Sequence, residues 1–233
     1  MKKYITLSAI ASVFLIIAVL FTSLRLVMNS ENRHAREYER LNVSERLGMS
    51  SDDILASLMV LVDYMEDRRD DIKLEVSVFG ETMEMFNERE TLHMEDVKDL
   101  FLTWRTASYL LFAVAVMIFA IVALILKKNA LFAITRGFLW GLGFICAIGI
   151  VITLWAVIDF NSFWTAFHLL FFDNDLWLLD GRTSRMINML PSEFFSNIIL
   201  EFITLGMGVI LLLGASSLIH VVSEKRRKLK NNF

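Results

Sequence analysis

Long apolar stretches constrain this chain more than any other feature of its sequence. A helix of about 20 mostly apolar residues can cross the hydrocarbon core of a bilayer. Four stretches are long and apolar enough to do so: Tyr4–Met28, Ala107–Leu126, Phe138–Ile158 and Ile198–Val222. Hydrophobic residues make up 56% of the 233 positions, more than in a soluble domain. The sequence therefore predicts an all-α membrane protein with four transmembrane helices and a small extracytoplasmic cap.

The first apolar stretch also has a feature of a secretory signal peptide, because Lys2 and Lys3 precede it. Its apolar run is longer than that of a typical signal peptide, and no small-residue cleavage site ends it. We therefore interpret it as an uncleaved anchor.

The distribution of charge predicts the orientation of the chain. Lys and Arg concentrate at the N-terminus, in Lys127–Arg136 and after Val222, where Glu224 is the only acid of these three segments. Cytoplasmic loops are rich in Lys and Arg, so both termini are predicted to be cytoplasmic. The tail sequence KRRKLK then favours attraction to anionic lipid headgroups over nucleic-acid binding.

These features predict the organisation of the chain. The expected segments are transmembrane helices at 1–28, 105–126, 138–158 and 198–222, an extracytoplasmic cap at 29–104, a cytoplasmic loop at 127–137, an extracytoplasmic active-site loop at 159–197, and a basic cytoplasmic tail at 223–233. Near the membrane boundary, Glu201 is an acid about one turn into the last span. It is expected to snorkel, or to pair with Arg105 or Arg25.

The cap is expected to contain helices and a β-hairpin. Ser51 is a candidate N-cap for a helix whose first turn carries acids. Residues Lys73–Phe79 and Thr82–Phe86 alternate in polarity on either side of Gly80, a pattern typical of two strands joined by a tight turn.

The third span begins with Gly137-x-x-x-Gly141. Small residues allow helix backbones to approach closely in lipid, so we expect a packing role. Cys146 is the only cysteine. It can form no disulfide within the chain, and an apolar setting would raise its pKa, so it is not expected to be a nucleophile.

A first group of candidate catalytic residues lies on one predicted helix. Asn87-x-x-Glu90 resembles a capping box, and the helix it starts is expected to continue without a break into the second span. Glu90, His93 and Asp96 recur every three residues and so share a helix face. A carboxylate beside an imidazole fixes its tautomer and raises its basicity. The alternative is a solvated face of an acidic cap.

The second candidate is His168, within the sequence FHLLFF and shortly before Asp173 and Asp175. The alternative is an aromatic belt at the membrane interface that happens to include a histidine. Two histidines and an acid are also compatible with zinc, but neither HExxH nor paired cysteines occur, so we predict no metal.

These motifs together resemble those of a known family. They are Glu90-x-x-His93-Met94-x-Asp96-Val97, Phe167-His168-x-x-Phe171-Phe172, Trp177 and Met189-Leu190-Pro191-x-x-Phe194-Phe195. They resemble a small family of four-span bacterial integral membrane proteins that includes the lipoprotein intramolecular transacylase. The resemblance covers nearly the whole chain.

The resemblance implies a reaction in which an ester-linked acyl chain moves from the diacylglyceryl group of a lipoprotein to the amine of its N-terminal cysteine. It also implies a monomeric enzyme of the bacterial cytoplasmic membrane, without a cofactor, that acts at the extracytoplasmic face among membrane lipids. The expected catalytic residues are His168 and His93, with Asp96 and Glu90 orienting His93. The expected substrate-binding residues are Phe171, Phe172, Asp175 and Trp177.

Two other classes of function stay open from the residues themselves. One is a membrane sensor or adaptor without catalytic activity, whose acidic cap binds a ligand or partner. The other is a metal-dependent membrane hydrolase that uses the two histidines.

Overall fold

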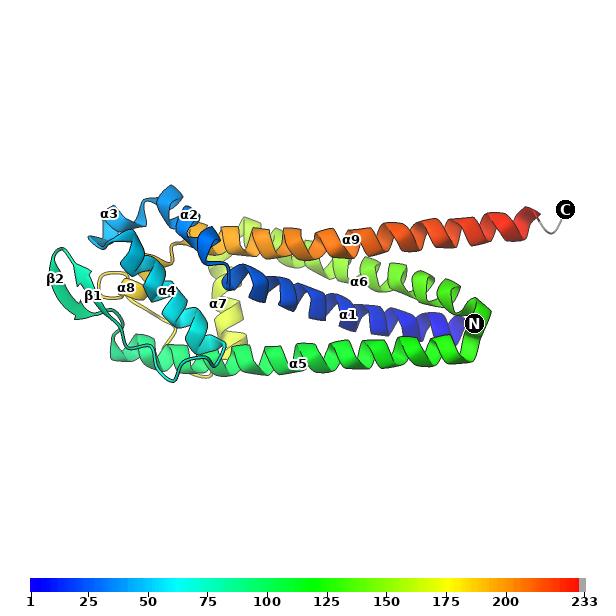
Figure 1. The fold of residues 1–233 in the computed structure, drawn as a ribbon, viewed down its shortest axis with the longest axis horizontal. Helices are drawn as coiled ribbons and strands as arrows, with labels where there is room; N and C mark the ends of the chain where they lie inside the picture. Colours follow the sequence, from blue (N-terminus) through cyan, green and yellow to red (C-terminus); the bar gives the residue numbers. More distant parts are fainter. Residues whose placement is uncertain (231–233) are drawn as a thin grey trace. The chain divides into compact units, whose positions relative to one another are not determined.

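A computed structural model describes residues 1–230 of the chain. Its elements in order are α1 (Lys2–Met28), α2 (Glu31–Leu41), α3 (Val43–Leu47), α4 (Ser51–Met65), β1 (Glu75–Val78), β2 (Glu81–Glu84), α5 (Glu88–Leu126), η1 (Lys127–Asn129), α6 (Ala130–Ile158), α7 (Phe160–Phe171), α8 (Arg185–Met189) and α9 (Ser192–Lys230) (Figure 1).

Contacts within the chain define two compact units. The first contains Met1–Ser23, Thr106–Phe163 and Ile203–Phe233, and the second contains Leu24–Arg105 and Trp164–Phe202. The first unit is built from the apolar parts of the long helices. The second unit holds most of the polar residues and every candidate catalytic residue.

Small residues bring α1 and α6 together in the first unit. A Cβ atom added to Gly137 would lie 2.4 Å from the Ser8 Cβ and 2.7 Å from the Ile5 carbonyl oxygen. One added to Gly141 would lie 2.8 Å from the Ala9 carbonyl oxygen. Any larger side chain would therefore separate the two helices, which confirms the predicted packing role of this motif.

Three helical stretches of the described chain are long and apolar enough to cross a membrane, and they are Lys2–Met28, Glu88–Ile158 and Ser192–Glu224. The second stretch is 71 residues long and consists of α5, η1 and α6. At η1 the backbone of Lys127 has a φ of 47°, and there the chain reverses its direction (Figure 1, green). The chain is therefore a helical membrane protein.

The predicted hairpin is present in the second unit. Strands β1 and β2 pair antiparallel, with Glu75 opposite Glu84 and Val78 opposite Glu81. Phe79 and Gly80 form the turn, with φ angles of 48° and 86°. Positive φ at both positions of a two-residue turn matches the twist of the strands.

Helix starts in the second unit are only partly as expected. Ser50, not Ser51, caps α4, because its hydroxyl accepts a 3.0 Å hydrogen bond from the Asp53 amide. The capping box at α5 is confirmed, since the Asn87 and Glu90 amides each donate to the other residue's side chain. From there α5 runs unbroken to Leu126, as predicted.

The ion pairs differ from the expected ones. Arg25 and Arg105 pair with Glu66, at 2.7 and 3.4 Å, and Glu201 pairs instead with Arg33 at 2.9 Å. The Glu66 side chain is almost fully buried, so it is the stronger partner for two guanidinium groups. The expected pairing of Glu201 with Arg105 or Arg25 is therefore wrong.

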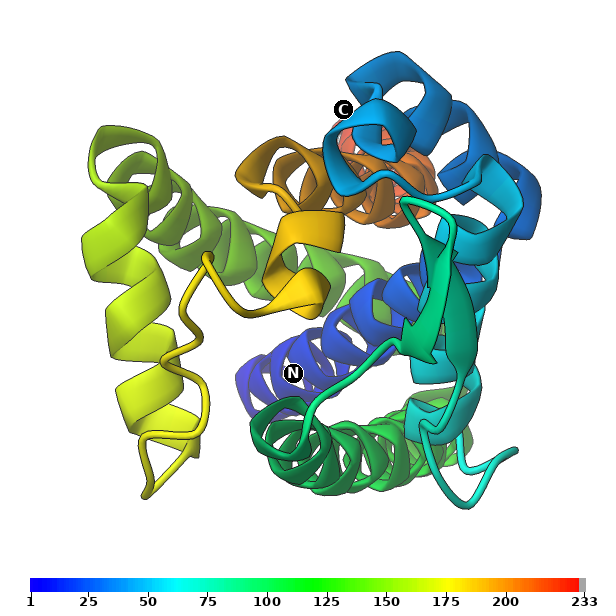
Figure 2. The same cartoon turned by 90° about the vertical axis from the view of Figure 1, so that its left-hand side faces the viewer.

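The segment expected as an active-site loop is largely helical. It contains α7, which carries His168 near its C-terminal end, and the short helix α8. In Figure 2 the chain leaves α7 as an extended yellow loop and enters α8. Helical geometry fixes the backbone of His168, whereas the residues that follow it are held by loop hydrogen bonds.

Candidate active site

The structure brings His93 and His168 together. His93 lies in the charged N-terminal part of α5, ahead of the apolar window of that helix, and both side chains are buried. The ring centroids are 6.1 Å apart and the ring planes are inclined by 34°. The two rings, which come from α5 and α7, are therefore neighbours in the second unit.

The imidazole of His168 is held by a hydrogen bond and by aromatic contacts. Its Nδ1 lies 2.8 Å from the carbonyl oxygen of Trp164. A carbonyl only accepts, so Nδ1 carries the proton and the neutral ring has its lone pair on Nε2. Trp177 stacks on the ring at 4.6 Å and 27°. Burial lowers the pKa of His168, which keeps that lone pair available at neutral pH.

The imidazole of His93 lies in a different environment. Burial, assisted by His168, lowers the pKa of His93 to about 4, although the charge of Asp96 acts in the opposite direction. Its Nδ1 is buried and has no hydrogen-bond partner among residues 1–230. Phe172 lies edge-on to the ring at 5.5 Å. His93 is therefore neutral over the physiological pH range.

Asp96 is linked to the loop that follows α7. One of its carboxylate oxygens accepts a 2.8 Å hydrogen bond from the side-chain amide of Asn174. Asp96 lies one helical turn after His93 and acts on it through its charge. The sequence spacing predicted this proximity to His93.

Glu90 has a different set of contacts from those expected. Its side chain is fully buried, and one oxygen accepts from the Ser184 hydroxyl at 2.6 Å and the Met186 amide at 3.0 Å. The other oxygen accepts from the Asn87 amide at 2.7 Å. Glu90 therefore joins the start of α5 to the start of α8, and it influences His93 by holding its helix rather than by bonding to its ring.

Two of the expected substrate-binding residues lie beside the histidines. Phe172 is buried, and its ring centroid lies 5.5 Å from that of each histidine. Trp177 covers a face of His168. Together these rings make the surroundings of the two imidazoles apolar, which is the cause of the lowered histidine pKa values.

The other two expected substrate-binding residues lie further out. Phe171 contacts Trp104 edge-on at 6.2 Å. Asp175 is exposed, and its carboxylate pairs with Arg89 at 3.1 Å. This pair joins the loop after α7 to the first turn of α5.

Several residues that shape the site were not predicted from the sequence. Trp164 could have been found by helical spacing, since its carbonyl lies four positions before His168. Asn174 is an isolated amide between two acids, and Ser184 caps α8 through its hydroxyl. Their contacts are made with α5, far away in sequence, so local patterns carried no signal for them.

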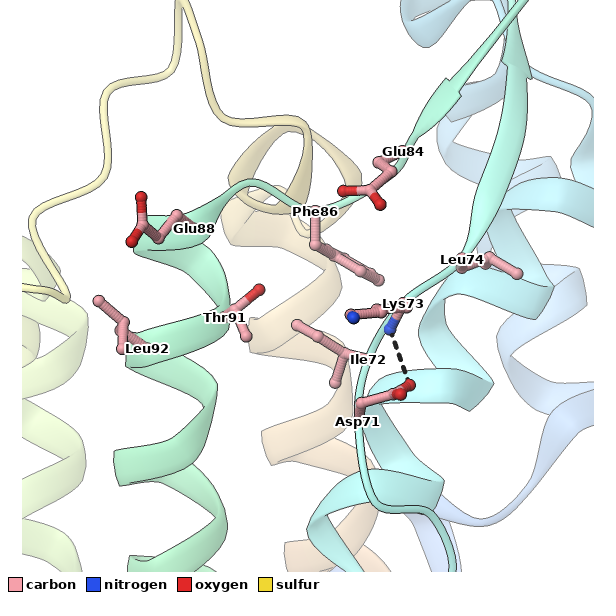
Figure 3. Close-up of a pocket in the computed structure, with 9 residues that line it drawn as sticks. All are labelled: Asp71, Ile72, Lys73, Leu74, Glu84, Phe86, Glu88, Thr91 and Leu92. Carbon is pink, nitrogen blue, oxygen red and sulfur yellow. Dashed lines mark hydrogen bonds between the residues drawn. The ribbon is translucent and has the colours of Figure 1, made fainter.

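A cavity of about 280 Å³ opens elsewhere in the second unit, next to the hairpin. It is lined by Asp71, Ile72, Lys73, Leu74, Glu84, Phe86, Glu88, Thr91 and Leu92 (Figure 3). Neither histidine lines it. Its walls carry acids and one lysine around apolar side chains, without a group suited to acid–base chemistry at neutral pH.

Within residues 1–230, no three His, Cys, Asp or Glu side chains gather into a group able to hold a metal ion. The paired histidines have aromatic rather than carboxylate neighbours in direct ring contact.

The fold and the site define a helical integral membrane protein with a buried pair of neutral histidines. The sequence model of one family, described as lipoprotein intramolecular transacylase Lit, matches residues 9–195. The chain belongs to this family.

Solved structures share the fold of this chain. The membrane integral lipoprotein intramolecular transacylase Lit from Bacillus cereus is 21% identical, with a TM-score of 0.73 over 95% of this chain and 96% of that one. Variants of that protein with one histidine replaced by arginine or by alanine both have TM-scores of 0.71 at 20% identity. These cover 97% of this chain and 94% and 95% of theirs. No curated protein matches the chain.

Proposed function

We propose that this protein is an acyltransferase that moves an acyl chain within a bacterial lipoprotein. The substrate is a diacylglyceryl lipoprotein with a free N-terminal cysteine amine, and the product is its lyso form. The observation that carries the proposal is the pair of buried, neutral imidazoles 6.1 Å apart in a member of the Lit family.

The reaction needs one base and no covalent enzyme intermediate. The amine nitrogen attacks the ester carbonyl, and a C–N bond forms as the C–O bond to the glyceryl group breaks. We assign His168 as the base, because its Nε2 carries the lone pair when Nδ1 donates to Trp164. It takes the proton from the amine and returns it to the departing glyceryl oxygen, so the proton balance closes.

We assign His93 to the oxyanion of the tetrahedral intermediate. A histidine whose pKa is held at about 4 stays neutral and offers an N–H donor without losing its proton. A donor placed in a dry site stabilises the developing negative charge strongly. Nucleophile and ester belong to one molecule, so binding them in a reactive geometry supplies much of the acceleration.

The remaining candidates have supporting roles in this proposal. Asp96 tunes His93 through its charge, and Glu90 holds α5 in place. Phe171 and Phe172 contact the acyl chain, whereas Asp175 and Trp177 shape the headgroup end of the site. Membrane lipids surround a monomeric enzyme that needs no cofactor.

The topology is part of the proposal. We infer four transmembrane helices at 1–28, 105–126, 138–158 and 198–222, with α5 and α6 crossing separately. The lysines at η1 and the basic tail then lie in the cytoplasm, and the segments 29–104 and 159–197 lie outside. A cysteine introduced at Thr82 in a Cys146→Ala background should react with an impermeant reagent on intact cells. A cysteine at Asn129 should react only after permeabilisation, and the reverse pattern would contradict this topology.

The reaction itself is tested with a purified protein and a diacylated lipopeptide. The product should have the same mass as the substrate, with fragment ions that place one acyl chain on the N-terminal amide. Release of free fatty acid would indicate a hydrolase, and an unchanged lipopeptide would favour a sensor or adaptor.

A further inference from the structure

Asn174, in the loop after α7, bonds to α5 through its side-chain amide and to Trp177 through its backbone carbonyl. Its Nδ2 donates to Asp96 on α5 at 2.8 Å. Its Oδ1 accepts from the Leu176 amide at 3.0 Å, and its backbone carbonyl accepts from the Trp177 indole N–H at 3.0 Å. One residue therefore connects α5 with the tryptophan that covers His168.

The Trp177 ring restrains His168 in a direction that the Trp164 bond does not. The hydrogen bond from Nδ1 to the Trp164 carbonyl fixes one nitrogen but permits the ring to rock about that bond. The stacked Trp177 ring, 4.6 Å away and inclined by 27°, opposes this rocking by direct contact. The rings of Trp164, Phe167 and Phe172 also contact the imidazole, at 4.7, 5.3 and 5.5 Å, but Trp177 is the one of these four that lies further along the loop after α7. The direction in which Nε2 points thus depends in part on where the loop holds Trp177.

We propose that Asn174 is a positioning residue for the acyl transfer, which ties the Trp177 indole to Asp96 and so fixes the direction of the His168 lone pair. This inference rests on the proposed function. It adds a residue that touches neither substrate nor imidazole and acts on His168 through Trp177.

The same loop has a second link to α5, the pair of Arg89 and Asp175. Its side chains are 42% and 77% exposed, and an exposed ion pair contributes little to stability. Arg89 also donates to the backbone carbonyl of Asp175. This link therefore holds the loop, but it does not bond to the indole. Asn174 is the residue that joins the loop's attachment on α5 to the Trp177 ring.

The first test compares Asn174→Ala with the unmodified protein. Asp173→Asn, at the exposed neighbouring position, is the matched control. Asn174 is itself exposed, so the thermal midpoint should change little. The rate of transfer should fall by about tenfold to a hundredfold, as expected when a reacting group is displaced by about 1 Å. The loss should appear in kcat rather than in KM.

The second test follows His168 without any substrate. A stacked indole shifts the resonance of the imidazole Cε1 proton upfield, and the His168 signal is identified by its loss in His168→Ala. In Asn174→Ala this signal should move downfield, whereas in Asp173→Asn it should stay in place.

A rescue separates a hydrogen-bond link from a loss of folding. Asn174→Asp places two carboxylates against each other and should displace the His168 signal. Adding Asp96→Asn restores a donor and an acceptor with reversed direction, so the signal should return toward its original position. Retention of both signal and rate in Asn174→Ala, or a failed rescue in a folded double variant, would overturn the inference. Absence of transfer in the unmodified protein would overturn the proposed function, while the His168 signal would still report on the link.

Discussion

The two histidines differ in how their side chains are held. The C-terminal end of α7 locks His168 through a backbone hydrogen bond and a stacked tryptophan. The N-terminal part of α5 buries His93 but leaves its Nδ1 without a partner among the described residues. Burial lowers the pKa of both rings, but it is His168 whose tautomer is fixed by a hydrogen bond.

In the proposed reaction, this difference allows one residue type to serve two roles. A base must present its lone pair in a fixed direction, which the locked ring of His168 does. An oxyanion donor must stay protonated on one nitrogen and uncharged, which burial achieves for His93. The comparison therefore predicts that the two positions respond differently to the same substitutions.

The largest expected effect is the loss of the base. His168→Ala should reduce the transfer rate by about 10²–10⁴-fold. His168→Gln should be no better, because an amide cannot take up the proton. The rate is measured with the diacylated lipopeptide, and a variant that keeps full activity would refute the role of His168.

Replacing His93 should reduce the transfer rate by an amount that depends on whether the new residue can donate a hydrogen bond. His93→Ala should cost about 10²–10³-fold, as the loss of an oxyanion donor does. His93→Gln retains an N–H donor and should recover part of that loss. If glutamine rescues position 168 but not position 93, the two assignments are reversed.

Glu90→Ala tests whether Glu90 stabilises the N-terminal end of α5. Glu90→Ala leaves the donors of Asn87, Ser184 and Met186 without their acceptor in a buried site. The free energy of unfolding should fall on the order of 3 kcal/mol. Glu88→Ala, on the same turn but exposed, should change it by less than about 0.5 kcal/mol. Thermal melts followed by circular dichroism measure both.

The pH dependence tests the buried state of His93. Its pKa is lowered from 6.5 to about 4, so the unfolded chain binds more protons between these values. This contribution to stability is fully present above pH 6.5 and is lost as the pH falls toward 4. Melts at pH 7 and pH 5 should differ more in the unmodified protein than in His93→Gln. Equal differences would show that His93 is not buried as described.

The rate of transfer should depend on pH through the substrate. Both histidines are neutral at pH 7 because burial lowers their pKa values, whereas an α-amino group has a pKa of about 8. The rate should therefore rise from pH 6 to pH 8 as the amine loses its proton. A profile that is flat across this range would contradict attack by the amine.

The smallest expected effect is at Cys146. It is only partly buried in the middle of α6, within the first unit, and plays no part in the contrast between the histidines. Cys146→Ala should leave the transfer rate within about twofold, since no acyl-enzyme is formed. A strong loss would point to a covalent intermediate.

Features fixed by neighbouring residues were predictable from the sequence. The hairpin about Gly80, the Asn87–Glu90 capping box and the small-residue face at Gly137 each follow from short patterns. The approach of His93 to His168 was expected from the resemblance, because spacing alone favoured a solvated helix face for His93.

Contacts between distant segments were not predictable. Glu90 accepts a hydrogen bond from α8, Asn174 donates one to Asp96, and Arg33 forms an ion pair with Glu201, all across long sequence separations. Each depends on which polar groups are buried together in the fold. A single sequence shows which side chains can pair but not which of them meet. The contacts of Glu90 with Ser184 and Met186 could therefore not be predicted, whereas its place on the helix face of His93 could.

The most direct test of the account uses two lipopeptides that differ only at the N-terminus. The peptide with a free cysteine amine should convert to an isomer of identical mass with one acyl chain on the amide. The N-acetylated peptide has lost the attacking lone pair and should stay unchanged. Free fatty acid from both peptides, or a protein made heavier by one acyl chain, would contradict direct transfer of the acyl chain from the glyceryl ester to the amine.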